Sequence, residues 1–325
     1  GRLLVGRLLI GRLLVGLVGF AIRRVDGVDQ IPIRGTARIV GRFVEKAAER
    51  GHDVTLFDAA DRIGGQFNIA KQIPGKEDFN ETLRYFGKRI ETTGVKLRLN
   101  TRAEAAALKA DGFDHVVLAT GISPRKPAIP GIESDKVATY LDIIEGRKVA
   151  GKSVAIIGAG GIGFDVGEFL THAHDERSES ERFNSEWGID PTYASRGGLK
   201  PAVDEKAPRK VYLLQRKESK VGDGLAKTTG WIRRTLLKKR GVTMIPGVSY
   251  ERIDEAGLHI SVGGEAKTLP VDTIVVCAGQ ESRRELKAPL EAAGIPVTLI
   301  GGADVAAELD AKRAIDQGTR VAAAL

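Results

Sequence analysis

The chain has 325 residues, of which 42% are hydrophobic and 28% are charged, a composition typical of a folded protein with one or two domains. This excludes a collagen-like or wholly disordered chain, and the single cysteine excludes a disulfide framework, a cysteine-based zinc site and a four-thiolate iron–sulfur cluster within the chain. The formal net charge is +8, but residues 1–50 carry ten basic and four acidic side chains and account for most of it. Because the remainder is nearly neutral and the five histidines are scattered, we expect neither a nucleic-acid partner nor a metal site.

Residues 1–20 form a near-repeat of five residues, GRLLV-GRLLI-GRLLV-GLVGF, which nothing after residue 50 resembles. An arginine recurs in each of the first three copies, and a charge near the centre of a bilayer costs at least ~2.5 kcal/mol, so a membrane-spanning helix is not expected. The interrupted apolar run is also a poor signal peptide. We interpret residues 1–34 as a basic tail without an expected fold, with the composition that an altered reading frame gives in a GC-rich gene. The alternative is a basic helix over residues 1–24 that lies on a membrane surface.

From residue 46 onward, the sequence pattern predicts alternating helices and strands. Residues 46–50 end a helix, and residues 53–57 (DVTLF) form a short strand. A helix is expected at 77–92, and residues 114–119 (DHVVLA) form a nearly continuous apolar strand. Such a strand is typical of a buried parallel sheet.

Several residues near the ends of these strands are candidate cofactor ligands. Asp58 ends the first strand, where a dinucleotide-binding fold uses an acid to bind ribose hydroxyls; the alternative is an aspartate that only closes a turn. The paired glycines of Ile63-Gly64-Gly65-Gln66-Phe67 allow backbone to approach a ligand closely. Thr120-Gly121 follows the apolar strand, and the proline-rich stretch at 124–131 is typical of a crossover between domains.

The clearest motif lies in the middle of the chain. The apolar strand at 154–157 runs directly into Gly158-Ala159-Gly160-Gly161-Ile162-Gly163, and a helix is expected at 164–171. In this G-x-G-x-x-G pattern Gly158 allows the tight turn, Gly160 allows backbone to approach a pyrophosphate, and Gly163 allows the helix to pack on the strand. The N-terminus of that helix faces the phosphates with its partial positive charge. The motif therefore predicts a dinucleotide site, the alternative being a plain glycine-rich turn.

The next predicted strand, at 210–214, indicates which dinucleotide is bound. Gln215-Arg216-Lys217 follow it and supply two cations at the place where a cofactor with a free 2′-hydroxyl needs an acid. Arg216 and Lys217 therefore predict a 2′-phosphate, and hence NADP(H) over NAD, the alternative being a solvated basic turn. Residues 172–208, which separate this strand from the glycine motif, predict a charged insertion on the domain surface.

The C-terminal part returns to the same alternation. A helix is expected at 229–240, followed by a meander of short strands and by a buried parallel strand at 273–277. A strand at 297–300 leads into Gly301-Gly302-Ala303-Asp304 and then into an alanine-rich helix. In a flavin-binding fold, an aspartate at such a junction can accept a hydrogen bond from a ribityl hydroxyl; an N-cap of the helix is a compatible alternative.

From about residue 46 to its end the chain resembles the C-terminal FAD- and NADPH-binding half of bacterial 2,4-dienoyl-CoA reductase, which belongs to the old-yellow-enzyme-like flavoproteins alongside trimethylamine dehydrogenase. The most specific stretches are GHDVTLFDA (51–59), IGGQFNIAKQIPGKEDF (63–79), IIGAGGIGFD (156–165), EWGID (186–190), LLQRKESK (213–220), AKTTGWI (226–232), MIPGVSY (244–250), VVCAGQE (275–281) and IGGADVAAELDAKRAI (300–315). The long insertion with its EWGID segment favours the reductase over its amine-oxidising relatives.

The resemblance implies an electron relay. NADPH passes hydride to FAD, and electrons then pass through a four-iron cluster to FMN in an N-terminal (β/α)8 barrel, where the dienoyl thioester is reduced. By matching position, the resemblance implies an NADPH site made of Gly158, Gly160, Gly161, Gly163, Arg216 and Lys217. It implies an FAD site lined by Asp58, Gly64, Gly65, Gln66, Thr120, Gly121, Gly302 and Asp304. No catalytic residue is assigned.

Two departures from the family's pattern matter. The barrel and the cluster cysteines are absent from this sequence, so we expect at most the NADPH-to-FAD half reaction. The expected partner is an outside electron acceptor or a separate barrel protein. Cys277, the single cysteine, is interpreted as a small core residue. The family's first fingerprint falls at 35–40, where Ala37 and Val40 replace the second and third glycines, and the preceding residues 31–34 contain a proline. The added Cβ atoms crowd the pyrophosphate, and proline suits a central strand poorly, so an impaired FAD phosphate site is predicted.

We therefore expect an α/β protein with two Rossmann-like dinucleotide-binding domains. The FAD-like domain is discontinuous, at 35–147 and 271–325, and the NADPH-like domain is inserted at 148–270. Three functions are compatible with the sequence: an NADPH-dependent flavoprotein oxidoreductase fragment, an inactive NADP-binding remnant with an impaired FAD site, and a membrane-surface protein. Only the basic tail supports the third. A cytoplasmic location is compatible with the single cysteine.

Overall fold

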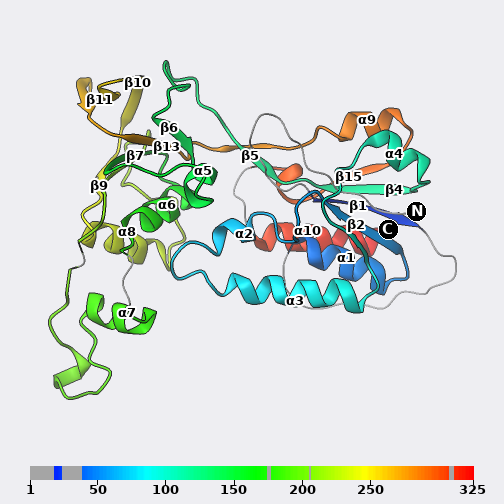
Figure 1. Ribbon diagram of the computed structural model, residues 1–325, viewed down its shortest axis with the longest axis horizontal. Coiled ribbons are helices and arrows are strands. Elements are labelled where there is room, and N and C mark those ends of the chain that lie inside the picture. Colours follow the sequence, from blue (N-terminus) through cyan, green and yellow to red (C-terminus); the bar gives the residue numbers. More distant parts are fainter. Residues whose placement is uncertain (1–17, 24–38, 174–176, 205, 307–310) are drawn as a thin grey trace. The chain divides into compact units, whose positions relative to one another are not determined.

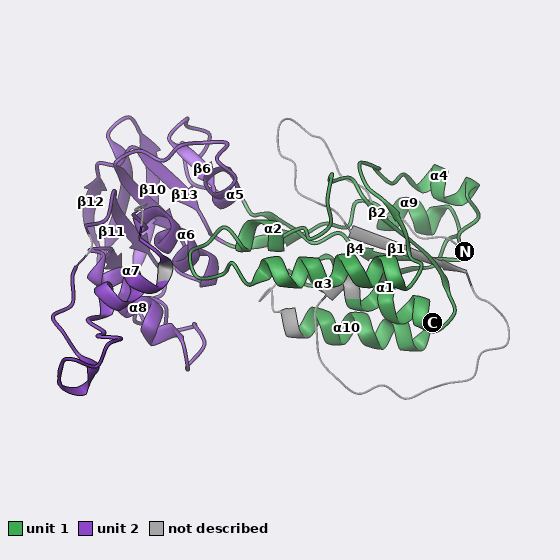
Figure 2. Ribbon diagram, turned by 60° about the horizontal axis from the view of Figure 1, so that its bottom comes forward, with its two compact units in different colours: residues 1–125, 279–325 green, residues 126–278 purple. Residues whose placement is uncertain are grey.

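The computed structural model describes residues 18–23, 39–173, 177–204, 206–306 and 311–325 (Figure 1). The chain divides into two compact units, which Figure 2 shows in different colours. Unit 1 consists of residues 1–125 and 279–325, and unit 2 consists of residues 126–278. Each unit is built on a five-stranded sheet accompanied by helices, so the predicted α/β class with two Rossmann-like domains is confirmed.

The sheet of unit 1 contains, in spatial order, β15 (Val297–Leu299), β4 (His115–Ala119), β1 (Val18–Arg23), β2 (Asp53–Asp58) and β3 (Lys96–Arg98). β15 is parallel to β4, and β2 is parallel to β3. β1 occupies the central position and runs antiparallel to both of its neighbours. The sheet is therefore parallel at its two sides and reversed at its centre.

Helices pack with this sheet and bury its apolar side chains. α1 (Ile39–Glu49) packs against α3 (Phe79–Thr92) and α10 (Ala311–Ala324), and Figure 1 shows these three helices together. Phe43 of α1 and Leu56 of β2 belong to the same buried core. The shorter elements of unit 1 are α2 (Phe67–Ala70), α4 (Ala105–Ala110), α9 (Lys287–Ala292) and the antiparallel pair β5 (Ile122–Pro124) and β14 (Gln280–Ser282).

The direction of β1 departs from what a phosphate-binding strand requires. Its first residue, Val18, pairs with Ala119 at the end of β4, and its last residue, Arg23, pairs with Asp53 at the start of β2. β1 therefore ends at the amino edge of its parallel neighbours, whereas a strand that turns directly into a phosphate-binding helix ends at the carboxyl edge. Residues 24–38 come between β1 and α1 and lie outside the described residues.

No fold was expected for the basic tail, and its residues 18–23 form a strand, so the alternative of a basic helix over residues 1–24 is wrong for these six residues. The sequence of this strand, VGFAIR, is apolar except for Arg23, and it lies between two buried strands whose backbone groups need partners on both sides. Residues 1–17, with most of the five-residue repeat, and residues 31–34 are outside the described part of the chain. Within the described ranges, no helix combines the length and the apolarity needed to cross a bilayer.

All strands of the unit 2 sheet are parallel. Their spatial order is β6 (Val137–Thr139), β13 (Thr273–Val276), β7 (Ser153–Ile157), β8 (Lys210–Leu214) and β9 (Thr243–Ile245). α5 (Tyr140–Ile144) and α8 (Gly230–Lys239) both pack against α6 (Gly161–Thr171). The antiparallel meander of β10 (Val248–Asp254), β11 (Gly257–Val262) and β12 (Glu265–Leu269) shares a buried core cluster with β7, β8 and β13.

The boundaries of the two units differ from the predicted ones at 147/148 and 270/271. β13 pairs with both β6 and β7, so residues 126–147 and 271–278 belong to unit 2. The sequence showed an apolar strand at 273–277 without showing which sheet it joins, because buried parallel strands have the same apolar pattern in either sheet.

The insertion that precedes β8 is tied to unit 2 by a buried ion pair. It contains α7 (Glu179–Trp187), which begins with a capping box between Ser178 and Glu181. Glu186, near the end of α7, accepts hydrogen bonds from Nε and Nη2 of Arg240 at 3.2 Å each. The two side chains are only 6% and 7% exposed, so each charge depends on the other for compensation.

We expect Arg240→Ala to lower the free energy of unfolding by about 3–5 kcal/mol, because the Glu186 carboxylate would stay buried without its cation. The double variant Glu186→Leu/Arg240→Met removes both charges and is expected to recover most of that loss. Urea unfolding followed by circular dichroism measures both effects. The matched control is Arg84→Ala, which breaks the exposed Glu81–Arg84 pair and is expected to leave the midpoint unchanged. Equal midpoints for Arg240→Ala and Arg84→Ala would contradict the anchoring role.

Candidate functional site

The glycine motif of unit 2 forms the turn between β7 and α6. Gly158 follows β7 with a φ of +108°, and a Cβ on it would lie 2.5 Å from the carbonyl oxygen of Cys277. A Cβ on Gly163 would lie 2.0 Å from the carbonyl oxygen of Gly158. Both positions therefore require glycine, the first for the turn and the second for the packing of α6 on β7.

Gly160 and Gly161 lie at the start of α6 beside open space. Gly160 is the N-cap residue, and no heavy atom lies within 4 Å of the Cβ that either glycine would carry. The first amide groups of a helix have no partner within the helix, and they form the positive end of its dipole. Open space next to these N–H groups fits the pyrophosphate of a dinucleotide.

This turn lies at the carboxyl edge of the parallel sheet, where the ends of three strands meet. The amide of Gly158 donates to the carbonyl of Leu214 at 3.0 Å, and the amide of Cys277 donates to the carbonyl of Ile157 at 2.8 Å. In open α/β sheets, ligands bind outside this edge. Burial raises the pKa of the Cys277 thiol above its ordinary value, so the thiol stays protonated and is a poor nucleophile.

Arg216 and Lys217 lie in the turn that follows β8, at the same edge, and both side chains are exposed. Gln215 holds this turn in place. Its Nε2 donates to the carbonyls of Lys217 at 3.1 Å and Ser219 at 2.7 Å, and its Oε1 accepts from the amide of Gly222 at 3.2 Å. The two cations are thus presented from a fixed backbone. The sequence did not indicate this role of Gln215, because one amide bridges these backbone groups only after the turn has folded.

Asp58, the predicted ribose ligand of unit 1, is the last residue of β2 and is 1% exposed. Its Oδ1 accepts a hydrogen bond from the amide of Ala60 at 2.8 Å. This contact is the strand-end turn that the sequence left open as the alternative. The turn is therefore observed, and the contact with a ribose stays a prediction.

Gly64, Gly65 and Gln66 lie in the loop that leads into α2. The amide of Phe67 donates to the carbonyl of Gly64 at 2.9 Å, which closes the loop. A Cβ on Gly64 would lie 2.5 Å from Leu83 of α3, whereas nothing lies within 4 Å of a Cβ on Gly65. The loop is therefore packed on one side and open at Gly65, where a ligand can approach the backbone.

The turns that follow β4 and β15 lie side by side and contain four predicted flavin contacts: Thr120, Gly121, Gly302 and Asp304. A Cβ on Gly302 would lie 3.2 Å from the carbonyl carbon of Gly121. Arg283 joins the first turn through its backbone, since its carbonyl accepts from the Thr120 hydroxyl and its amide donates to the carbonyl of Gly121 at 3.1 Å. The structure thus brings these four residues to one place.

Asp304 is held by Gln317, a residue of α10 that the sequence patterns did not single out. Nε2 of Gln317 donates to Oδ2 of Asp304 at 2.7 Å, and Oε1 of Gln317 accepts from the amide of Gly301 at 2.8 Å. One side chain therefore fixes both the carboxylate and the turn before it. No local pattern indicates this pairing, because it arises only when α10 packs beside the end of β15.

The predicted fingerprint for the FAD pyrophosphate is only partly described. Ala37 lies outside the described residues, and of Val40 only the backbone, in the first turn of α1, is described. Because β1 ends at the amino edge, β1 does not make a tight turn into α1 at the carboxyl edge. The described residues of unit 1 therefore fit the ribityl side of FAD and do not provide the strand–turn–helix cradle for its pyrophosphate.

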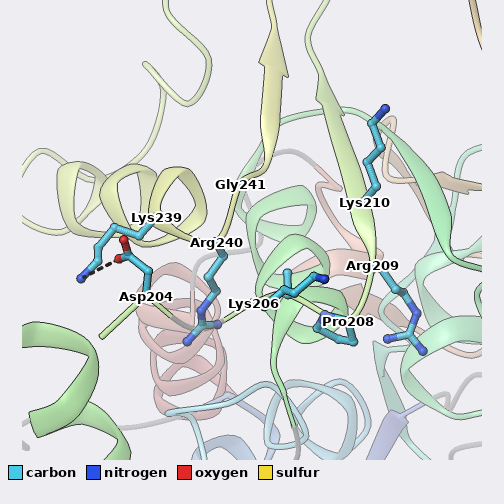
Figure 3. A pocket seen from close by; sticks show the side chains of 9 residues that line it. Asp204, Lys206, Pro208, Arg209, Lys210, Lys239, Arg240 and Gly241 are labelled. Atoms are coloured by element: carbon cyan, nitrogen blue, oxygen red, sulfur yellow. Dashed lines mark ion pairs between the residues drawn. The ribbon is translucent and has the colours of Figure 1, made fainter. Parts of the chain in front are cut away.

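A separate hollow of about 530 Å³ lies at the amino edge of the unit 2 sheet (Figure 3). Its described lining is rich in cations, but Figure 3 shows the charged ends of Lys210, Lys239 and Arg240 pointing in different directions. Lys239 lies 3.9 Å from Asp204. Since these cations do not converge and lie at the edge opposite the glycine turn, the hollow is not part of the dinucleotide site. No cluster of three metal-ligating side chains occurs in the part of the chain that the structure describes.

Comparison with known families agrees with this geometry. The model of the pyridine nucleotide-disulphide oxidoreductase family matches residues 42–314. The chain belongs to this family. Members of the family use FAD and a nicotinamide dinucleotide, so the expectation of an oxidoreductase with dinucleotide-binding domains is confirmed at this level. The disulphide in the family's name has no counterpart within this sequence, which contains one cysteine.

Relatives of the chain are longer proteins. A metal reductase of Desulforamulus reducens is 28% identical over 273 residues, which are 80% of this chain and 39% of that protein. The structure of 2-naphthoyl-CoA reductase in complex with 2-naphthoyl-CoA is 26% identical, with a TM-score of 0.72 over 88% of this chain and 38% of that one. Histamine dehydrogenase from Rhizobium sp. 4-9 shares the fold at 21% identity, with a TM-score of 0.66 over 91% of this chain and 45% of that one. The chain thus spans less than half the length of these relatives.

We expect Gly163→Ala to destabilise this family member by about 1–3 kcal/mol, because the new Cβ has to displace the Gly158 carbonyl. Gly161→Ala, two residues earlier on the same helix, is the matched control. Its Cβ meets open space, and alanine favours a helix over glycine by about 0.5–1 kcal/mol, so its stability is expected to stay the same or to rise. Thermal unfolding compares the two variants. Equal melting temperatures would contradict the packing constraint at Gly163.

Proposed function

We propose that the chain is the NADPH- and FAD-binding portion of an oxidoreductase that resembles 2,4-dienoyl-CoA reductase, and that it takes reducing equivalents from NADPH into FAD. One observation carries the proposal above all others. Gly158, Gly160 and Gly163 occupy the three positions of the dinucleotide fingerprint, and each has the surroundings that its position requires. The turn they form lies at the carboxyl edge of a fully parallel sheet, where such ligands bind.

The choice of NADP(H) over NAD is supported by the turn after β8. Arg216 and Lys217 present two exposed cations there, at the same edge as the glycine turn. An arginine forms strong charge-assisted hydrogen bonds with a phosphate, which a free 2′-hydroxyl cannot supply. We therefore assign to Arg216 and Lys217 the binding of the 2′-phosphate.

Binding of FAD is supported by unit 1 at the ribityl side. Asp304, held by Gln317, presents a carboxylate that can accept from a ribityl hydroxyl, and Gly121 and Gly302 allow close approach of a ligand. We assign Asp58 to the ribose of the adenosine end. Bound together, FAD and NADPH supply hydride-transfer chemistry, and the residues of this chain bind and orient the two cofactors.

The final electron acceptor is proposed to lie outside the described units. Relatives named as reductases and dehydrogenases contain more than twice the matched length, so the substrate-reducing part is expected in a further domain or a separate barrel protein. A thioester of coenzyme A is the proposed substrate class, on the resemblance to 2,4-dienoyl-CoA reductase and the likeness to 2-naphthoyl-CoA reductase.

A second candidate function is an NADP-binding remnant that turns over no substrate. The observation that favours it is the antiparallel direction of β1, which leaves the FAD pyrophosphate without a strand–turn–helix cradle from β1. The two candidates share the NADP(H) site and differ in whether unit 1 holds a flavin that NADPH can reduce.

We expect Arg216→Glu to weaken NADPH binding at least about tenfold and to change NADH binding less than about twofold, because only NADPH carries the 2′-phosphate. Isothermal titration calorimetry with both dinucleotides measures the two affinities. Lys220→Glu makes the same charge reversal four residues along the chain on another exposed side chain, and it is expected to change neither affinity by more than about twofold.

Two results would contradict this assignment. An equal loss of NADPH and NADH binding in Arg216→Glu would refute a 2′-phosphate contact. Absence of NADPH binding by the unaltered chain would refute the dinucleotide site itself.

A further inference from the structure

Tyr250 carries a hydroxyl group that is buried without a hydrogen-bond partner. The residue lies on β10, and its side chain packs against the core cluster that contains Leu214 and Ile260. Its Oη is shielded from solvent and has no partner among the described residues. Because buried polar groups in native proteins are almost always satisfied, an orphaned hydroxyl needs a physical explanation.

The start of β10 places this hydroxyl near the carboxyl edge of the unit 2 sheet, where the dinucleotide is predicted to bind. The amide of Val248, the first residue of β10, donates to the carbonyl of Gln215 at 3.0 Å, so β10 is bonded to the turn that carries Arg216. Tyr250 is two residues further along and, because side chains alternate along a strand, lies on the same face as Val248. The register shifts between Tyr250 and Arg252, and such bulges re-aim side chains beside binding sites.

Charge and burial agree with this position. Burial raises the pKa of Tyr250 above its ordinary value, while the positive charge of Arg216 acts in the opposite direction. Cys277, which follows β13, also acts on this pKa, so Tyr250 lies near the ends of both β8 and β13. The phenol is therefore neutral at physiological pH and keeps a proton that it can donate.

We propose that Tyr250 is a specificity-determining residue for NADPH and that its hydroxyl donates a hydrogen bond to the 2′-phosphate beside Arg216. This inference rests on the proposed function, because it requires a dinucleotide at the glycine turn. Arg216 is exposed in the turn that is hydrogen-bonded to the start of β10, so a phosphate held by Arg216 would lie beside this strand. A phosphate oxygen of NADPH would accept the hydrogen bond that the buried hydroxyl now lacks. The 2′-hydroxyl of NADH carries no charge and is therefore a weaker acceptor.

The test compares Tyr250→Phe with the unaltered chain by titration calorimetry, using NADPH, NADH and adenosine 2′,5′-bisphosphate. Phenylalanine keeps the ring and its packing, and only the hydroxyl is lost. We expect about a tenfold loss of affinity for NADPH and for the bisphosphate, and less than about a twofold change for NADH. Tyr212→Phe removes a hydroxyl from a tyrosine of the same core cluster, and as the matched control it is expected to leave all three affinities unchanged.

The outcomes separate this inference from the proposed function. An equal loss for NADPH and NADH, or no loss for any ligand, would overturn the role of Tyr250. Failure of the unaltered chain to bind NADPH or the bisphosphate would overturn the proposed function instead. Thermal unfolding gives a second measurement: Tyr250→Phe is expected to be at least as stable as the unaltered chain, because an unsatisfied donor has been removed. A less stable variant would show that the hydroxyl has a structural partner and would also overturn the proposal.

Discussion

The arrangement of unit 2 depends on a contact that leaves no room for a side chain. A Cβ on Gly163 would lie 2.0 Å from the carbonyl oxygen of Gly158, so α6 approaches β7 this closely only because residue 163 is glycine. The close approach directs the start of α6 to the carboxyl edge of the sheet, where the ends of β7, β8 and β13 also meet. The amide groups at the start of α6, which face open space, and the exposed cations Arg216 and Lys217 then lie at this one edge.

In the described part of unit 1, the central strand does not form the corresponding turn. β1 fills the central position of the sheet but ends at the amino edge, away from the edge that carries Asp58, Thr120 and Asp304. The residues predicted to contact the ribityl chain are nevertheless held in place, since Gln317 binds both Asp304 and the turn before it. We therefore propose for unit 1 a flavin site whose ribityl end is formed by described residues and whose pyrophosphate end receives no turn from β1, with reduced affinity for FAD as the expected result.

Local patterns in the sequence predicted the parts of the molecule that depend on neighbouring residues. The strand, glycine turn and helix from 153 to 171 fall within one segment, and so do the cations after β8. The patterns did not predict features that join distant segments. These are the direction of β1, the sheet to which β13 belongs, the hydrogen bonds of Gln317 to Asp304 and Gly301, and the unpartnered hydroxyl of Tyr250. An apolar pattern indicates that a strand is buried, but it does not indicate which strands are its neighbours or in which direction the strand runs.

The most direct test of this account is an anaerobic absorption measurement on the purified chain supplied with an excess of FAD. We expect NADPH to bleach the visible flavin band faster than it reduces FAD in buffer, NADH to do so more slowly, and desalting to remove most of the flavin. A chain that binds NADPH but reduces FAD no faster than buffer does would contradict the electron-transfer function and support the NADP-binding remnant. Flavin that remains bound after desalting would contradict the weakened pyrophosphate end of unit 1.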